Sequence, residues 1–297
     1  LSKNYDTKII GNFGNTILDK VNLKKYLSKI DILIIELSSY QLDKIKYLKL
    51  HYALITNIYS DHLDYHKNIN NYISSKFRIQ NFLYKNSYLF LSKKLLLKYR
   101  SYIKINNDKI IFFHDKLPKK KNLSSYIKDL NLNSIKNLIN HIDPSIKIEN
   151  TNITNDLNHR NQLIHNSNNL KVYNDSKCTN LNNSVYKNNL IKSNKKILIL
   201  GGKLKKQDKN LKFNIQNTLV LIFGYKPNLF INQINFINSN YFNFNNLTDL
   251  INFLKLTIKL HKYEYILFSP GGESFDIYKD YSDRGNHFIK LIKKALF

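Results

Sequence analysis

Five short apolar runs recur along the chain, and each is continuous rather than alternating with polar residues. They cover Asp31–Leu37, Tyr52–Ile58, Lys196–Leu200, Leu219–Phe223 and Tyr263–Phe268. Strands that are covered on both faces have this pattern, which is typical of parallel sheets packed between helices. The runs therefore predict buried strands of a mostly parallel sheet.

Amphipathic stretches fill the intervals between these runs. Near the end of the chain, Phe288, Leu291 and Ile292 fall on one helical face, and the neighbouring lysines fall on the other. Strand and helix alternate in two blocks, which are separated by a polar, Asn-rich stretch with weak periodicity, residues 106–169. This alternation predicts an α/β fold with right-handed crossovers.

Charge is the unusual feature of the composition: 47 basic and 21 acidic residues give a formal net charge of +26. Such a charge suggests a polyanionic partner, yet only four of the basic residues are arginines, the side chain preferred for phosphate and guanine contacts. The lysines are spread over the whole chain, so we interpret the charge as compositional drift and expect no nucleic-acid partner.

The composition also indicates the compartment. A single cysteine, Cys178, excludes a disulfide framework and fits a reducing environment. No apolar run approaches the roughly 20 residues of a membrane helix. We therefore expect a cytoplasmic protein without a membrane span.

Polar side chains follow several predicted strands at the point where each strand ends. Glu36 follows the first run, and Asp61 and His62 come shortly after the second. Ligands of open α/β sheets lie at the carboxyl ends of strands, so these residues, on strands that we expect to be neighbours, could bind a hard cation such as Mg²⁺. Capping or turn roles explain Glu36 and Asp61 equally well, and Lys76 has the pattern of an ordinary solvated helix lysine.

A loop rich in hydrogen-bond donors occurs in the second block. It covers Tyr173–Asn180, is preceded by His159 and Arg160, and leads into a helical pattern. Donors at a helix N-terminus suit phosphate or carboxylate groups, although a surface turn with an N-cap accounts for the same spacing. Paired glycines at 201–202 and 271–272 permit either close backbone approach to a ligand or a tight turn.

Taken in chain order, these motifs resemble those of the Mur ligase family. The central domain of that family is resembled by the segments Gly11–Gly14, Glu36–Leu42, Thr56–His66 and Tyr72–Ile79. Its C-terminal domain is resembled by His159-Arg160, Asn174–Asn180, Leu198–Lys203 and Ser269–Gly285. The resemblance implies a central ATP-binding and catalytic α/β domain over residues 1–156, followed by a Rossmann-like, amino-acid-binding domain over residues 157–297.

The resemblance also implies a reaction and its cofactors, ATP and Mg²⁺. It is closest to the branch of the family that joins D-glutamate to UDP-N-acetylmuramoyl-L-alanine through an acyl phosphate during peptidoglycan precursor synthesis. Glu36 would hold one Mg²⁺, and His62 and Lys76 would hold a second, with Lys76 carbamylated. These three residues are the implied catalytic set, and the partners are small-molecule substrates.

Further residues match substrate contacts of the family. Asn12, Ser38 and Gln41 match positions near the muramoyl substrate, and Arg160 and Asp175 match nucleotide contacts. The D-glutamate pocket is matched by Lys177, Thr179, Lys205, Ser274 and Tyr281. Cationic donors suit the two carboxylates of that amino acid.

The chain departs from the family in places. The glycine-rich phosphate-binding loop ending in Gly-Lys-Ser/Thr and the N-terminal uridine-nucleotide domain are missing from these 297 residues. We therefore expect an N-terminally truncated, monomeric ligase that does not complete the reaction by itself. A non-catalytic remnant of a Mur ligase and another amide ligase of the same superfamily are the alternatives.

Overall fold

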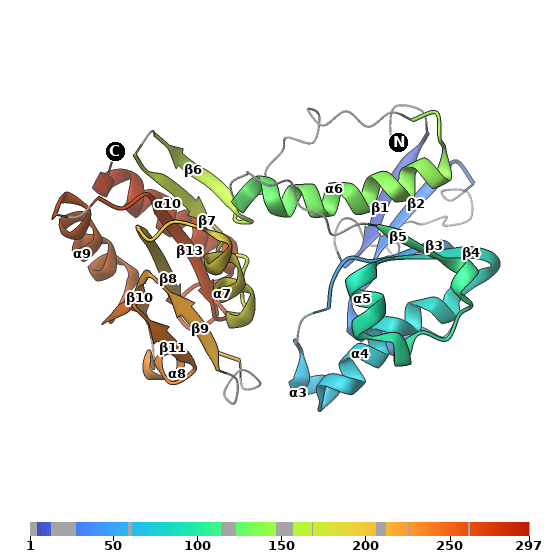
Figure 1. Cartoon of the computed structure of the whole chain (residues 1–297), viewed down its shortest axis with the longest axis horizontal. Coiled ribbons are helices and arrows are strands. Elements are labelled where there is room, and N and C mark those ends of the chain that lie inside the picture. The colour runs from blue at the N-terminus through green and yellow to red at the C-terminus, as the bar shows by residue number, and fades with distance from the viewer. Residues whose placement is uncertain are drawn as a thin grey trace. The chain divides into compact units, whose positions relative to one another are not determined.

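The computed structural model describes residues 5–12, 28–58, 61–113, 123–146, 157–167, 169–205, 212–224, 226–260 and 262–296, with backbone alone for 123–131 and 259–260. The chain divides into two compact units. The first comprises Leu1–Leu117 and Lys128–Asn150, and the second comprises Pro118–Ile127 and Thr151–Phe297. Both units contain mostly parallel strands and helices (Figure 1), which confirms the predicted α/β class.

Two small parallel sheets form the first unit. One pairs β1 (Thr7–Gly11) with β2 (Ile32–Glu36), and the other has the order β3-β4-β5. The remaining strands are β3 (Leu50–Ile55), β4 (Leu83–Ser92) and β5 (Ile110–Phe113). The helices are α2 (Ser39–Lys44), α3 (Leu63–His66), α4 (Ile69–Phe77) and α5 (Lys93–Lys98), together with α6 (Leu123–Ile142) from Lys128 onward.

The core of the first unit lies between the second sheet and the helices. Phe77 of α4 and Leu89 and Leu91 of β4 are buried there. One sequence prediction needs correction, because the expected neighbours β2 and β3 belong to different sheets. The stretch with weak periodicity, for which the sequence predicts no element, contains α6, a helix of 20 residues.

The second unit has one six-stranded sheet with the order β12-β10-β8-β13-β7-β6, in which only β6 is antiparallel. Its strands are β6 (Gln162–Asn166), β7 (Lys171–Asn174), β8 (Lys196–Gly201), β10 (Thr218–Phe223), β12 (Asn240–Phe244) and β13 (Tyr265–Gly271). A separate parallel pair joins β9 (Phe213–Gln216) and β11 (Ile234–Ile237). The helices are α7 (Leu181–Leu190), α8 (Asn228–Ile231), α9 (Leu247–Leu260) and α10 (Tyr281–Leu296).

Helices cover both faces of this sheet (Figure 1). On one face Leu181 and Val185 of α7 pack with β8, β9 and α8. On the other face Leu250 of α9 and Phe288 of α10 pack against the same strands. Every residue of β8 and β10 is buried, which explains their continuous apolar sequences.

One edge of the sheet differs from its centre. This edge is β12, in which four of the five residues are exposed. Tyr241 packs on Phe236, and Phe242 packs on Phe253, yet the rings of Tyr241 and Phe242 stay partly exposed to solvent.

Within the described parts of the chain, no helix is both long and apolar enough to cross a membrane.

Candidate functional site

The first strand pair brings Asn12 and Glu36 together. The backbone N–H of Asn12 donates to the carbonyl of Glu36 at 2.9 Å. Gly11 has a φ of +108°, and a Cβ placed on it would lie 2.2 Å from that same carbonyl oxygen. Glycine is needed here because any side chain would prevent this close approach. The result is an exposed carboxylate at the end of β2, beside Asn12.

Ser38 and Gln41, which match muramoyl-substrate positions, form the cap of α2. The backbone N–H of Gln41 donates to Ser38 Oγ at 3.3 Å, and the backbone N–H of Ser38 donates to Gln41 Oε1 at 2.9 Å. This reciprocal arrangement is a capping box, which satisfies two otherwise unpaired donors of the helix. Both side chains therefore have a structural role in this conformation, and their contact with substrate stays a prediction.

His62 has the backbone conformation of a strained residue, with φ 55° and ψ 33° in the left-handed region. Its Nδ1 lies 2.9 Å from the Tyr40 hydroxyl, and its Nε2 lies 3.6 Å from Asp61 Oδ2. A non-glycine residue in this region costs free energy, and such residues cluster at functional sites. The imidazole is thereby oriented by two side chains while remaining accessible.

Lys76 is the residue that the sequence alone could not distinguish from the other lysines. It lies in the last turn of α4 and is half-buried, with Nζ 6.0 Å from the centre of the Tyr72 ring. Burial lowers the pKa of its ammonium group, and the negative charges of Glu36 and Asp61 offset part of this lowering. The fold thus places Lys76 within electrostatic range of Glu36, the last residue of β2.

His66 belongs to the same cluster, although the sequence analysis did not select it. Its Nε2 lies 2.9 Å from Ser39 Oγ in the interior, and Ser75 donates to the backbone carbonyl of Ser39 at 2.7 Å. Burial lowers the pKa of His66, and the positive charges of His62 and Lys76 add to that shift. The sequence could have pointed to His66 through its spacing, because it comes four residues after His62 and hence one helical turn away.

These residues can be tested against the needs of a Mg²⁺ ion. Among the residues that the structure describes, no three His, Cys, Asp or Glu side chains converge as metal ligands. Glu36, Asp61 and His62 supply hard or borderline donors, but an amine or ammonium does not suit Mg²⁺. Lys76 would fit the set as a carbamate, which offers anionic oxygens.

In the second unit, the chain leaves β13 toward one face of the sheet and leaves its two neighbours, β7 and β8, toward the other face. From β7 and β8 it passes to the face covered by α7 and β9, whereas from β13 it passes to α10 on the opposite face. Adjacent parallel strands that diverge in this way open a crevice at their carboxyl ends, where ligands of α/β sheets bind. The residues predicted to bind the amino acid come after these strands: Lys177 and Thr179 follow β7, Lys205 follows β8, and Ser274 and Tyr281 follow β13.

Two of these residues contact each other directly. Lys177 Nζ lies 3.8 Å from the centre of the Tyr281 ring, a cation–π contact at short range. Ser274 is buried, while Lys177, Thr179 and Lys205 are half-buried. The loops after β8 and β13 are joined by two backbone hydrogen bonds of 2.8 Å between Lys203 and Glu273.

An acidic side chain caps the first turn of α10. Asp280 Oδ1 accepts from the backbone N–H groups of Ser282 at 2.7 Å and Asp283 at 2.8 Å. The carboxylate thereby caps the helix and opposes its positive end.

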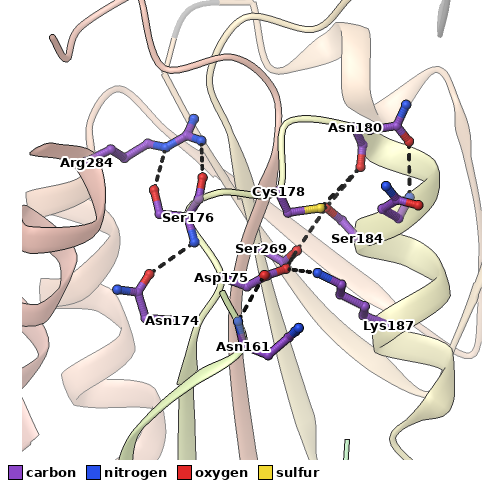
Figure 2. A network of polar contacts seen from close by, with 11 residues as sticks. Asn161, Asn174, Asp175, Ser176, Cys178, Asn180, Ser184, Lys187, Ser269 and Arg284 are labelled. Carbon is purple, nitrogen blue, oxygen red and sulfur yellow. Dashed lines mark hydrogen bonds and ion pairs between the residues drawn. The ribbon is translucent and has the colours of Figure 1, made fainter. Parts of the chain in front are cut away.

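Asp175 and Arg160, the residues that match nucleotide contacts, differ strongly in exposure. Arg160 is exposed, whereas Asp175 is buried and fully engaged (Figure 2). Asp175 Oδ1 accepts from the backbone N–H of Asn161 at 3.1 Å. Asp175 Oδ2 accepts from Ser269 Oγ at 2.7 Å and from Lys187 Nζ at 2.6 Å.

Arg284 is completely buried beside this network (Figure 2). Its guanidinium donates to Ser176 Oγ at 3.1 Å, to the Ser176 carbonyl at 2.7 Å and to the Gly272 carbonyl at 2.9 Å. Burial lowers the pKa of Arg284 to about 10, and the negative charge of Asp276 acts against this shift. Arg284 therefore holds the loops after β7 and β13 to each other and to α10.

Fold and strand-end residues together define an α/β protein whose second unit carries lysine and hydroxyl side chains after the carboxyl ends of parallel strands. The profile of the Mur ligase middle domain matches residues 2–149. UDP-N-acetylmuramoylalanine--D-glutamate ligase of Prochlorococcus marinus (strain MIT 9312) is 31% identical over 317 residues, which cover 96% of this chain and 67% of that protein. The ligase of the same name from Fervidobacterium nodosum (strain ATCC 35602 / DSM 5306 / Rt17-B1) is 27% identical, covering 100% of this chain and 70% of that protein.

Solved structures share the fold. MurF ligase from Thermotoga maritima, in complex with ADP, matches with a TM-score of 0.60 at 14% identity, covering 99% of this chain and 81% of that chain. MurF from Acinetobacter baumannii matches with a TM-score of 0.55 at 10% identity. The chain belongs to the Mur ligase family, which confirms the resemblance drawn from its motifs. It spans about two thirds of the length of the curated relatives.

Proposed function

We propose that the chain carries the metal-binding and amino-acid-binding parts of an ATP-dependent ligase that joins D-glutamate to UDP-N-acetylmuramoyl-L-alanine. The observation that supports this most strongly is Lys76, a half-buried lysine within electrostatic range of Glu36 and of Asp61, whose carboxylate lies 3.6 Å from His62 Nε2. The similarity to ligases named for this reaction supports the choice of substrates. The proposal places the protein in the cytoplasm as a monomer, in peptidoglycan precursor synthesis.

Lys76 is suited to carbamylation for a physical reason. A neutral amine attacks CO₂, a new N–C bond forms, and one proton leaves to solvent, so the product is an anionic carbamate. Burial favours the neutral amine over the ammonium. Glu36 would hold one Mg²⁺, and the carbamate together with His62 would hold a second. Bound Mg²⁺ would neutralise charge on a transferring phosphoryl group.

The second unit would bind the amino acid and part of the nucleotide. Lys177 and Lys205 supply cations for the two carboxylates of D-glutamate, and Thr179 and Ser274 supply hydroxyl donors. Tyr281 fixes the direction of Lys177 through the cation–π contact. Arg160, which is exposed, is the proposed nucleotide contact.

Carbamate formation tests the first unit without requiring turnover. With ¹³C-bicarbonate, we expect a carbamate signal in the NMR spectrum of the chain that is lost in Lys76→Ala. The matched control is Lys94→Ala, which changes an exposed lysine of α5 and should keep the signal. A spectrum without any Lys76-dependent carbamate would contradict this part of the proposal.

Turnover requires one further element. Residues 1–297 contain no Gly-Lys-Ser/Thr segment, and phosphate positioning supplies much of the catalysis in phosphoryl transfer. We expect the isolated chain to bind D-glutamate, measured by calorimetry, but to show no ATP turnover in a coupled assay with the muramoyl substrate. Robust turnover by the isolated chain would contradict this expectation, and binding of another amino acid in preference to D-glutamate would favour a different amide ligase.

A further inference from the structure

Tyr40 of α2 contacts one of the proposed metal ligands, although the proposed function gives it no role. Its hydroxyl lies 2.9 Å from Nδ1 of His62, and the centres of the two rings are 4.8 Å apart. The other nitrogen of that imidazole, Nε2, faces Asp61, whose Oδ2 lies 3.6 Å away. The two ring nitrogens of His62 therefore have different neighbours, a hydroxyl on one side and a carboxylate on the other.

Tyr40 is itself held in place by its helix and by a second ring. It lies in the first turn of α2, which the capping box of Ser38 and Gln41 fixes. Its ring also packs on the ring of Tyr65, with 4.6 Å between the two ring centres. Because the hydroxyl belongs to a fixed side chain, it can orient the imidazole of His62 rather than follow it.

The imidazole of His62 has two orientations of nearly the same shape. The outer torsion of a histidine side chain is broad and roughly two-fold, so a half-turn exchanges each ring nitrogen with a ring carbon. Only one of the two orientations presents Nδ1 to the Tyr40 hydroxyl and Nε2 to Asp61. The other would place a C–H group against the hydroxyl and lose that hydrogen bond.

A metal-binding histidine is normally fixed by a hydrogen bond to its second nitrogen, and that bond decides which nitrogen is left for the metal. We propose that Tyr40 is a positioning residue of the metal site: its hydroxyl holds Nδ1 of His62, so that Nε2, on the side of Asp61, binds the divalent cation. The inference rests on the proposed function, since it takes His62 as a metal ligand. Asp61 also acts electrostatically on Lys76, so Nε2 and the other proposed ligand of this cation share a carboxylate neighbour.

A hydroxyl group suits this position because it can both donate and accept a hydrogen bond. In the metal-free chain, Nε2 can keep its proton, facing Asp61, while Tyr40 donates to Nδ1. A nitrogen that binds a cation must present its lone pair, so the proton leaves Nε2 to solvent and Nδ1 takes one up. Tyr40 then accepts from Nδ1, and the contact is kept in both tautomers of His62.

Tyr40→Phe tests this role, because it removes the hydroxyl and keeps the ring that packs on Tyr65. Mn²⁺ accepts the carboxylate ligands that suit Mg²⁺, and its binding to the whole chain in bicarbonate buffer can be measured by electron paramagnetic resonance. We expect Tyr40→Phe to weaken Mn²⁺ binding about tenfold to a hundredfold, as the loss of a ligand's hydrogen-bond partner does in other metal sites. The matched control is Tyr65→Phe, whose lost hydroxyl bonds to the exposed Asp43 at 3.0 Å; its Mn²⁺ binding should stay within about twofold of the wild-type chain.

A second measurement observes the imidazole directly. In ¹⁵N spectra of the metal-free chain, the Nδ1 signal of His62 should shift in Tyr40→Phe and stay in place in Tyr65→Phe. The signals of His141, which packs on Tyr52 and Tyr88 in the same unit, should stay in place in both variants and thus report that the unit is folded. Addition of diamagnetic Mg²⁺ to the wild-type chain should move the ring proton of His62 from Nε2 to Nδ1.

The outcomes separate this inference from the proposed function. Mn²⁺ binding that is unchanged in Tyr40→Phe, or an Nδ1 signal that does not shift, would overturn the positioning role and leave the metal site standing. Tighter Mn²⁺ binding in Tyr40→Phe would also overturn it, because the hydroxyl would then be blocking Nδ1 as the ligand. If the wild-type chain binds no Mn²⁺, the proposed metal site itself fails, and the role of Tyr40 fails with it.

Discussion

Gly285→Ala is the substitution for which the structure makes the sharpest claim about stability. Gly285 lies in the second turn of α10, and a Cβ built on it would lie 2.2 Å from Nδ1 of His159 and 2.9 Å from Cε1 and Cγ of the same ring. The imidazole is buried and bonded to Asn174, so it cannot rotate away freely. The added methyl group must displace either the ring or the helix.

The expected change in the free energy of unfolding is the balance of opposing contributions. Alanine is favoured over glycine in a helix by about 1 kcal/mol. Overpacking costs about 1–3 kcal/mol, and the loss of the His159–Asn174 hydrogen bond costs about 1 kcal/mol more. The clash outweighs the helix preference, so Gly285→Ala should lower the free energy of unfolding of the second unit by about 1–3 kcal/mol.

A double-mutant cycle provides the control. His159→Ala removes the ring and destabilises the unit, but Gly285→Ala should then be neutral or stabilising by up to about 1 kcal/mol in that background, because the methyl group has room. Urea unfolding followed by circular dichroism measures all four chains. Equal stabilisation by Gly285→Ala in both backgrounds would refute the contact between α10 and the His159 loop.

Three further outcomes follow from buried groups. Arg284→Lys cannot keep all of the hydrogen bonds to Ser176 and should lower the free energy of unfolding by about 2–4 kcal/mol in urea titrations. Burial gives His66 a folded pKa below its unfolded value near 6.5, so its contribution to the free energy of unfolding is complete above that pH. The contribution is lost as the pH falls toward the folded pKa, by at most about 1.4 kcal/mol per pH unit. A pH dependence of stability that stays the same in His66→Gln would contradict this. Gly202→Ala, at a φ of +88° and with its Cβ 2.3 Å from the Glu273 carbonyl, should separate the two crevice loops and speed their proteolysis.

Much of the fold could be predicted because burial on both faces leaves a clear trace in the sequence. The runs that became β8, β10 and β13 are continuous and apolar, and each lies in the centre of the six-stranded sheet. The first half of β4 contains Lys85, Asn86 and Ser87, so it has no such run and was missed. Neighbour relations depend on contacts far apart in the chain, which is why β2 and β3 were wrongly paired.

The sequence likewise predicted some residues of the candidate sites and missed others. Motif order predicted that Glu36, His62 and Lys76 act together, and the structure gives Lys76 the burial and nearby charge that spacing cannot show. Lys187 had no signal, because nothing in the sequence marks one lysine of 47 basic residues as the partner of Asp175. The partner of a buried charge is decided by tertiary packing.

The edge strand β12 has a consequence for how the protein behaves at high concentration. Between Lys226 and Asp249 the sequence has no charged residue, although lysines are frequent elsewhere. Natural edge strands commonly use lysine or proline to discourage pairing with another molecule, and the strand Asn240–Phe244 has neither. Its position at the edge of the sheet and the partly exposed rings of Tyr241 and Phe242 make it a segment prone to aggregation. The large net charge of the rest of the chain opposes this self-association, because molecules of like charge repel each other. The repulsion weakens as salt is added.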